Sequence, residues 1–156
     1  MIHIILALAL QPGAATAAEG EIPPYTISDA NAGGEPYAGD RLFNAFNGKA
    51  GIDRVVADLV ASSVADPRIG DIFRGHDLAR LNRTLAEQFC YLLSGGCAYT
   101  GRDMAAVHKD MGLQTADLNA LIENLQRAMD KEGVPFRAQN KLLAKLAPMK
   151  RSIVER

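Results

Sequence analysis

The chain has 156 residues, of which 48% are hydrophobic and 22% are charged, so it can bury one sizeable core and is not a disordered chain. Its formal net charge is −1, with 17 Lys and Arg against 18 Asp and Glu, and no overall positive field favours nucleic acid or an anionic membrane as a partner. Trp is absent, strand-like alternation is scarce and Ala and Leu are abundant, which predicts an all-α domain.

The first 18 residues differ from the rest of the chain. A continuous apolar run over Ile4–Leu10 is too short to span a bilayer, and the helix-breaking Pro12-Gly13 and a series of small residues follow it. This order predicts a secretory signal over 1–18, cleaved after Ala17 or Ala18, and hence an exported, periplasmic protein without stable membrane insertion. Because no Lys or Arg precedes the apolar run, a disordered leader or a misassigned start codon is the alternative.

Residues 19–40 are rich in Pro and Gly and have no apolar period. We predict a flexible linker here, because nothing in the segment could bury a continuous apolar face. An ordered arm packed on the domain is the alternative. The remaining residues, 41–156, form the predicted globular domain.

Four long segments of this domain have the apolar spacing of amphipathic helices. The first ends at Asp66-Pro67, and Asp77 can cap the second. The third begins near Thr115, and Pro148 is expected to kink the fourth. The predicted helices span residues 50–64, 77–93, 117–132 and 137–153.

A short helical segment between the second and third of these helices carries the chemistry. It places His108 on the same side as Met104 and Met111, so the imidazole is expected to point inward. A buried neutral imidazole can hydrogen-bond to a backbone carbonyl, or it can give one ring nitrogen to a metal while the other donates to a carbonyl. The spacing alone leaves both a core histidine and a metal ligand open.

Short motifs follow one another in a specific order along residues 42–154. In chain order they are Phe43–Gly48, Ile52–Val56, Ala65–Ile69, Ile72–Gly75, Phe89, Gly95-Gly96, Tyr99–Met104, Val107-His108 and Gly133–Pro135. Their composition and spacing resemble those of the group 1 truncated haemoglobins, a family of bacterial-like globins. The resemblance implies a truncated globin fold, in which two pairs of helices form a two-over-two sandwich around a non-covalent haem b.

The resemblance also implies that His108 is the proximal ligand of the haem iron and that Phe73 stacks against the porphyrin edge. A porphyrin is a large apolar plate, so nearby apolar side chains are expected to line it, with ordinary core packing as the alternative for each. The candidates for this lining are Val60, Phe73, Leu81, Leu85, Phe89, Met104, Val107, Leu118 and Ile122. The candidates to pair with the haem propionates are Arg80, Arg83 and Arg102.

The distal side departs from the family pattern. Many group 1 members use a Tyr and a Gln to hydrogen-bond dioxygen at the iron, whereas the matching positions here hold Val60 and Leu85. Since Leu81 is apolar as well, only Thr84 and Gln88 could reach in with a polar group. We therefore predict weak retention of dioxygen, while carbon monoxide and nitric oxide depend less on such donors.

Two cysteines and one further histidine complete the list of reactive side chains. Cys90 and Cys97 bracket the flexible Gly95-Gly96, so they could pair in an oxidising compartment, whereas in a reducing one both are small buried hydrophobes. Their spacing is not the C-x-x-C-H pattern of covalent haem attachment. His76, just before the distal helix, is expected to cap or stay solvated rather than bind the iron.

Three functions fit these features. The favoured one is a haem protein that binds dioxygen, carbon monoxide and nitric oxide at a five-coordinate iron held by His108, for gas sensing or electron transfer. The second is a haem enzyme that detoxifies nitric oxide or peroxide, which would need a redox partner or distal acid and base groups. The third is a haem-free interaction protein with a globin fold.

Overall fold

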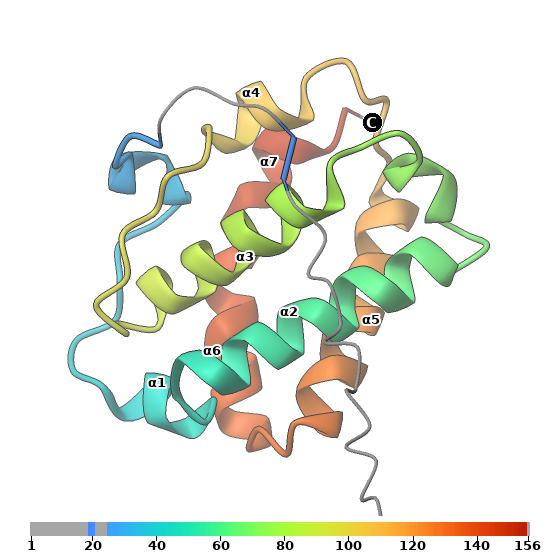
Figure 1. Cartoon of the computed structure of the whole chain (residues 1–156). Helices are drawn as coiled ribbons and strands as arrows, with labels where there is room; N and C mark the ends of the chain where they lie inside the picture. Colours follow the sequence, from blue (N-terminus) through green and yellow to red (C-terminus); the bar gives the residue numbers. More distant parts are fainter. Residues whose placement is uncertain (1–18, 21–24, 156) are drawn as a thin grey trace, which may run out of the picture.

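A computed structural model describes residues 19–20 and 25–155, so the predicted signal segment over 1–18 lies outside the described residues. In the described part every regular element is a helix (Figure 1), which confirms the all-α prediction. None of these helices is long and apolar enough to cross a bilayer. The long helices are α2 (Gly48–Ala65), α3 (Leu78–Leu92), α5 (Thr115–Lys131) and α6 (Phe136–Leu146). The short elements are α1 (Arg41–Ala45), α4 (Met104–His108), α7 (Lys150–Ile153) and the 3-10 helices η1 (Asp29–Ala32), η2 (Gly70–Phe73) and η3 (Ala147–Met149).

Capping side chains and a proline determine where the long helices begin and end. The carboxylate of Asp77 caps α3 by accepting the backbone N–H of Arg80 at 3.0 Å. At the start of α5, the carboxylate of Asp117 accepts the backbone N–H of Gln114 at 2.9 Å. The fourth predicted helix breaks around Pro148 into α6, η3 and α7, because proline has no N–H to continue the helical ladder.

Two pairs of helices form the body of the domain. α2 packs against α3 and α5, and α6 packs against the same two helices. In Figure 1, α2 and α3 lie in front of α5 and α6. Each long helix contributes a side chain that is at most 2% exposed to a shared core, namely Ile52, Phe89, Met129 and Leu142. Burial of each such side chain stabilises the fold by about 1.5–3 kcal/mol, and the two-over-two arrangement follows.

Residues 25–40, which we call the N-terminal arm, are packed on the domain. Ala32 is fully buried, and its carbonyl accepts a hydrogen bond from Nε2 of Gln88 at 2.8 Å. The backbone N–H of Ser28 donates to the carbonyl of Tyr99 at 2.7 Å. These residues therefore form the ordered arm and not the predicted flexible linker, because backbone hydrogen bonds and a small buried side chain hold them in place without an apolar stripe.

A disulfide fastens the C-terminal end of α3 to the loop that leads to α4. It joins Cys90 and Cys97, whose Cα atoms are 5.7 Å apart. The chain between them turns tightly at Gly95, where a Cβ atom would overlap the ring of Phe43. Since no real Cβ tolerates such a contact, this turn requires glycine.

Candidate functional site

α4 ends on His108 and holds its ring by one nitrogen. The helix begins where the carboxylate of Asp103 accepts the backbone N–H of Ala106 at 2.9 Å. One turn later, Nδ1 of His108 lies 2.8 Å from the carbonyl oxygen of Met104. A carbonyl only accepts, so Nδ1 carries the proton and donates. Nε2 then has a lone pair, and no described residue forms a hydrogen bond with it.

The surroundings of His108 favour the neutral ring. Burial lowers its pKa below the ordinary value, against the opposing effect of the hydrogen bond to Met104. Neutral imidazole is the form that binds metals. Within the described residues, no three His, Cys, Asp or Glu side chains gather to hold a bare metal ion. A single imidazole suits an iron that a porphyrin already holds by its four ring nitrogens.

The apolar residues predicted to line a haem fall into two groups. Val60 and Phe89 are 4% and 2% exposed in the core, and Leu81 and Leu85 pack against that core. The others lie outside this cluster on η2, α4 and α5. They are the half-buried Phe73, Met104, Leu118 and Ile122 and the exposed Val107. The structure thus brings together the predicted lining residues of α2 and α3 in the core. The predicted lining residues of η2, α4 and α5 keep exposed apolar surface, which a large apolar ligand could cover.

The polar side chains considered for the distal side are engaged elsewhere. Oγ1 of Thr84 donates to the carbonyl of Arg80 one turn earlier in α3, at 3.0 Å. Nε2 of Gln88 donates to the carbonyl of Ala32 in the N-terminal arm. His76 is exposed. The sequence identified Thr84 and Gln88 as potential donors, but it did not reveal that the arm engages the second of them.

The three arginines considered for the propionates differ in their surroundings. Arg83 is held by the carboxylates of Glu19 and Glu87, at 2.6 and 2.8 Å, and Arg102 is exposed. Arg80 has only a long contact of 3.7 Å to the carboxylate that caps α3, and its buried Nε has no hydrogen-bond partner among the described residues. A buried N–H of this kind lacks an acceptor. Arg80 therefore fits a ligand that carries carboxylates, as haem does.

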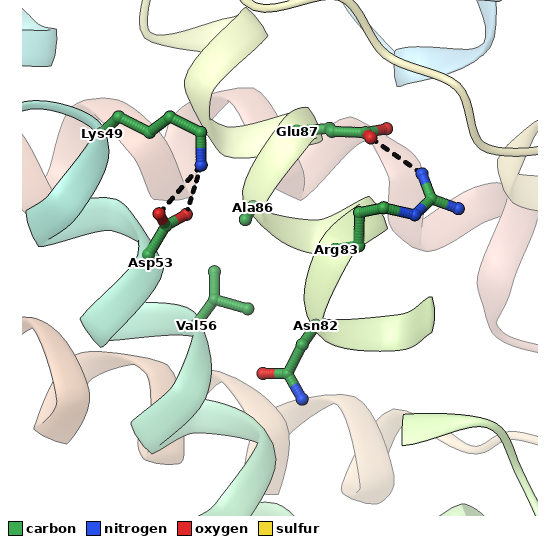
Figure 2. Close-up of a pocket in the computed structure, with 7 residues that line it drawn as sticks. All are labelled: Lys49, Asp53, Val56, Asn82, Arg83, Ala86 and Glu87. Atoms are coloured by element: carbon green, nitrogen blue, oxygen red, sulfur yellow. Dashed lines mark hydrogen bonds and ion pairs between the residues drawn. The ribbon is translucent and has the colours of Figure 1, made fainter. Parts of the chain in front are cut away.

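A surface hollow between α2 and α3 is a different place from the His108 site. Figure 2 shows the residues that line it, which are Lys49, Asp53, Val56, Asn82, Arg83, Ala86 and Glu87. Its charged side chains are paired, Lys49 with Asp53 and Arg83 with Glu87, each at 2.8 Å. Among the residues predicted to contact haem, Arg83 alone lines this hollow, and the carboxylates of Glu19 and Glu87 already hold it, so we assign the hollow no part in the site.

The helical sandwich, together with a neutral histidine at the end of a short helix, defines a globin of the two-over-two, truncated type. Comparison with family models gives the particular family. The model described as bacterial-like globin matches residues 41–155, so the chain belongs to the bacterial-like globin family. Its relatives place it among the group 1 truncated haemoglobins, which are haem-binding globins.

Individual proteins agree with this assignment. The chain is 26% identical over 108 residues to the group 1 truncated hemoglobin GlbN of Mycolicibacterium paratuberculosis, covering 69% of this chain and 79% of that protein. It is 29% identical over 93 residues to the group 1 truncated hemoglobin of Tetrahymena thermophila, covering 60% and 77%. The solved Fe(III) truncated hemoglobin of Tetrahymena pyriformis superposes with a TM-score of 0.70 at 23% identity, covering 74% of this chain and 98% of the other. These likenesses confirm the truncated globin fold.

Proposed function

We propose that this protein binds haem b non-covalently, with Nε2 of His108 as the single protein ligand of the iron, and that it binds small diatomic gases. The observation that carries the proposal is the hydrogen bond from Nδ1 to the carbonyl of Met104, which leaves Nε2 of a neutral ring open. When bound, haem would supply an iron that can bind a gas molecule. Both cysteines are joined in the disulfide, which supports non-covalent binding.

The chain's own residues would hold and orient the group. The carbonyl of Met104 fixes the ring of His108 and increases the basicity of Nε2. Nε of Arg80 would gain the acceptor that it lacks from a propionate. The half-buried apolar side chains of Phe73 and Leu118 would lose exposed surface against the porphyrin, at about 25 cal/mol per Å².

We expect the protein to retain dioxygen weakly. Dioxygen gains partial negative charge when a globin holds it, and a distal N–H or O–H group stabilises that charge. Leu81 and Leu85 offer no donor, and Thr84 and Gln88 donate to backbone carbonyls instead. Carbon monoxide and nitric oxide depend less on such donors. This pattern favours gas sensing or electron transfer over oxygen storage.

The rate of dioxygen dissociation tests the proposal. We expect fast dissociation from the haem-reconstituted ferrous protein in stopped-flow displacement by carbon monoxide. Leu85→Gln should slow it by about tenfold, because one hydrogen bond to a charged acceptor is worth ~1.5 kcal/mol or more. Leu85→Met is the control, since it is similar in size and has no donor, and it should stay within about twofold of the wild type. Slow dissociation that Leu85→Gln leaves unchanged would contradict the proposal.

We also propose that the protein acts outside the cytoplasm. The sequence of residues 1–18 predicts export, and the Cys90–Cys97 disulfide supports it, because disulfides persist mainly in oxidising compartments.

A further inference from the structure

The positive charge of this nearly neutral chain is concentrated at its C-terminal end. Residues 134–154 contain five Lys and Arg and no Asp or Glu. Residues 1–133 contain 11 Lys and Arg against 17 Asp and Glu. The chain is therefore an acidic body with a basic end, a distribution that the net charge of −1 conceals.

The structure places these five cations along α6 and α7, and we call them the basic stripe. They are Arg137, Lys141, Lys145, Lys150 and Arg151. The first three are spaced i, i+4, i+8 along α6, which aligns them along one side of the helix. All are exposed except Lys145, which is half-buried. Every ion pair within 4.0 Å in the described part of the chain involves other cations.

The N-terminal arm orders the middle of the basic stripe. Oη of Tyr37 donates to the carbonyl of Lys141 at 3.0 Å. The ammonium groups of Lys145 and Lys141 lie 4.3 and 5.8 Å from the centre of the Tyr37 ring, within the range of cation–π attraction. These two side chains therefore have fewer conformations to lose when a partner binds, which favours docking.

The far end of the stripe lies beside the helix that carries His108. α7, which holds Lys150 and Arg151, packs against α4, and Figure 1 shows the two helices side by side. The chain after α7 is tied to the loop after α4 as well, since the backbone N–H of Glu155 donates to the carbonyl of Leu113 at 3.0 Å. A protein bound along the stripe would thus sit next to the element that we propose holds the iron.

We propose that the basic stripe is the docking surface for an acidic electron-transfer protein, an inference that rests on haem binding at His108. Charge complementarity steers such a partner to the basic end and away from the acidic body. The partner gives up one electron and is oxidised, and the ferric haem takes up that electron and becomes ferrous. No covalent bond forms or breaks, and no proton is needed.

The test uses an acidic flavodoxin, chemically reduced, as the probe. The full chain is loaded with haem, and two quantities are measured over a range of NaCl concentrations: the dissociation constant by calorimetry and the rate of ferric haem reduction by stopped flow. At low salt, Lys141→Gln/Lys145→Gln should weaken binding and slow reduction by about tenfold. Added salt should shrink this difference.

Arg74→Gln/Arg127→Gln is the matched control. It removes the same charge from exposed side chains just after η2 and on α5, whose ion pairs contribute little to stability. This variant should stay within about twofold of the wild type. Equal losses in the two double variants, or no loss in either, would overturn the proposal. So would binding to phosphatidylglycerol vesicles that depends on the stripe while flavodoxin binding does not.

Two readouts separate this inference from the proposed function. The Soret band of the haem-loaded variants reports haem binding, and Lys141→Gln/Lys145→Gln should leave it intact. Calorimetry with the haem-free chain reports docking alone. Flavodoxin binding without a Soret band would refute haem binding and with it the electron-transfer role, whereas a normal Soret band with no stripe-dependent flavodoxin binding would refute only the docking surface.

Discussion

At the scale of single residues, the environment of His108 favours one protonation state. The hydrogen bond to Met104 fixes the proton on Nδ1, and burial lowers the pKa of the ring. Burial favours the neutral ring that binds a metal, and the hydrogen bond selects the tautomer in which Nε2 keeps its lone pair. The same preference must appear in the stability of the haem-free protein, because a pKa that differs between the folded and unfolded states makes folding depend on pH.

We expect the haem-free protein to lose stability on acidification through His108. Between the lowered pKa of the folded protein and the ordinary value of about 6.5, the unfolded chain binds more protons than the folded chain does. The stabilising contribution is therefore fully present above about pH 6.5 and is lost as the pH falls. Urea unfolding at several pH values measures this, and His108→Gln should flatten the dependence in that window.

His76→Gln is the control for this measurement, since the side chain of His76 is exposed. It should leave the pH dependence of the unfolding free energy as it is in the wild type. A pH dependence that survives in His108→Gln would show that burial of this ring is not its cause.

The site could be predicted from the sequence only in part. The spacing of Met104, His108 and Met111 predicted an inward imidazole, and the motif order gave it a metal-binding interpretation. The hydrogen bond from Gln88 to Ala32 could not be predicted, because Ala32 lies 56 residues away in a segment with no periodic pattern. Gly33, which follows Ala32, has a φ of 85°, and a Cβ there would meet Met149 at 2.6 Å, but neither feature can be read from the sequence.

At the scale of elements, the long helices were predictable and the N-terminal arm was not. Helices α2, α3, α5 and α6 follow from apolar spacing and caps, which act within a few residues. The arm is held by hydrogen bonds to distant partners, such as the one from the backbone N–H of Tyr37 to the carbonyl of Leu92 at 3.0 Å. Such contacts leave no local pattern in the sequence.

The disulfide is the covalent restraint at this scale, and its removal should lower stability. We expect Cys90→Ala/Cys97→Ala to reduce the free energy of unfolding by about 2–3 kcal/mol, because the bond removes conformations from the unfolded chain. Urea unfolding without reductant measures the change. Reductant should lower the stability of the wild type by a similar amount and leave the double variant unaffected.

Thiol titration checks the premise of that prediction. Unreduced, unfolded wild-type protein should not react with a thiol reagent, since both cysteines are joined. Reaction at both positions would contradict the disulfide, and with it the support that the disulfide gives to export.

At the scale of the whole molecule, the core, His108 and the basic stripe lie on different parts of the fold. The helical sandwich buries the core, α4 presents His108 at its end, and the basic stripe lies on the adjacent C-terminal helices. The sandwich could be inferred from the sequence because the four long apolar stripes must cover one another. The proximity of the stripe to α4 could not, because it depends on how α7 packs after the break at Pro148.

Resonance Raman spectroscopy of the ferrous, haem-loaded protein tests the central claim most directly, since it detects the bond between the iron and a histidine nitrogen. We expect an iron–histidine stretching band in the wild type and in His76→Ala, and its loss in His108→Gly, with recovery when free imidazole is added. A band that persists in His108→Gly without imidazole, or a wild-type protein that binds no haem, would contradict the assignment of His108 as the iron ligand.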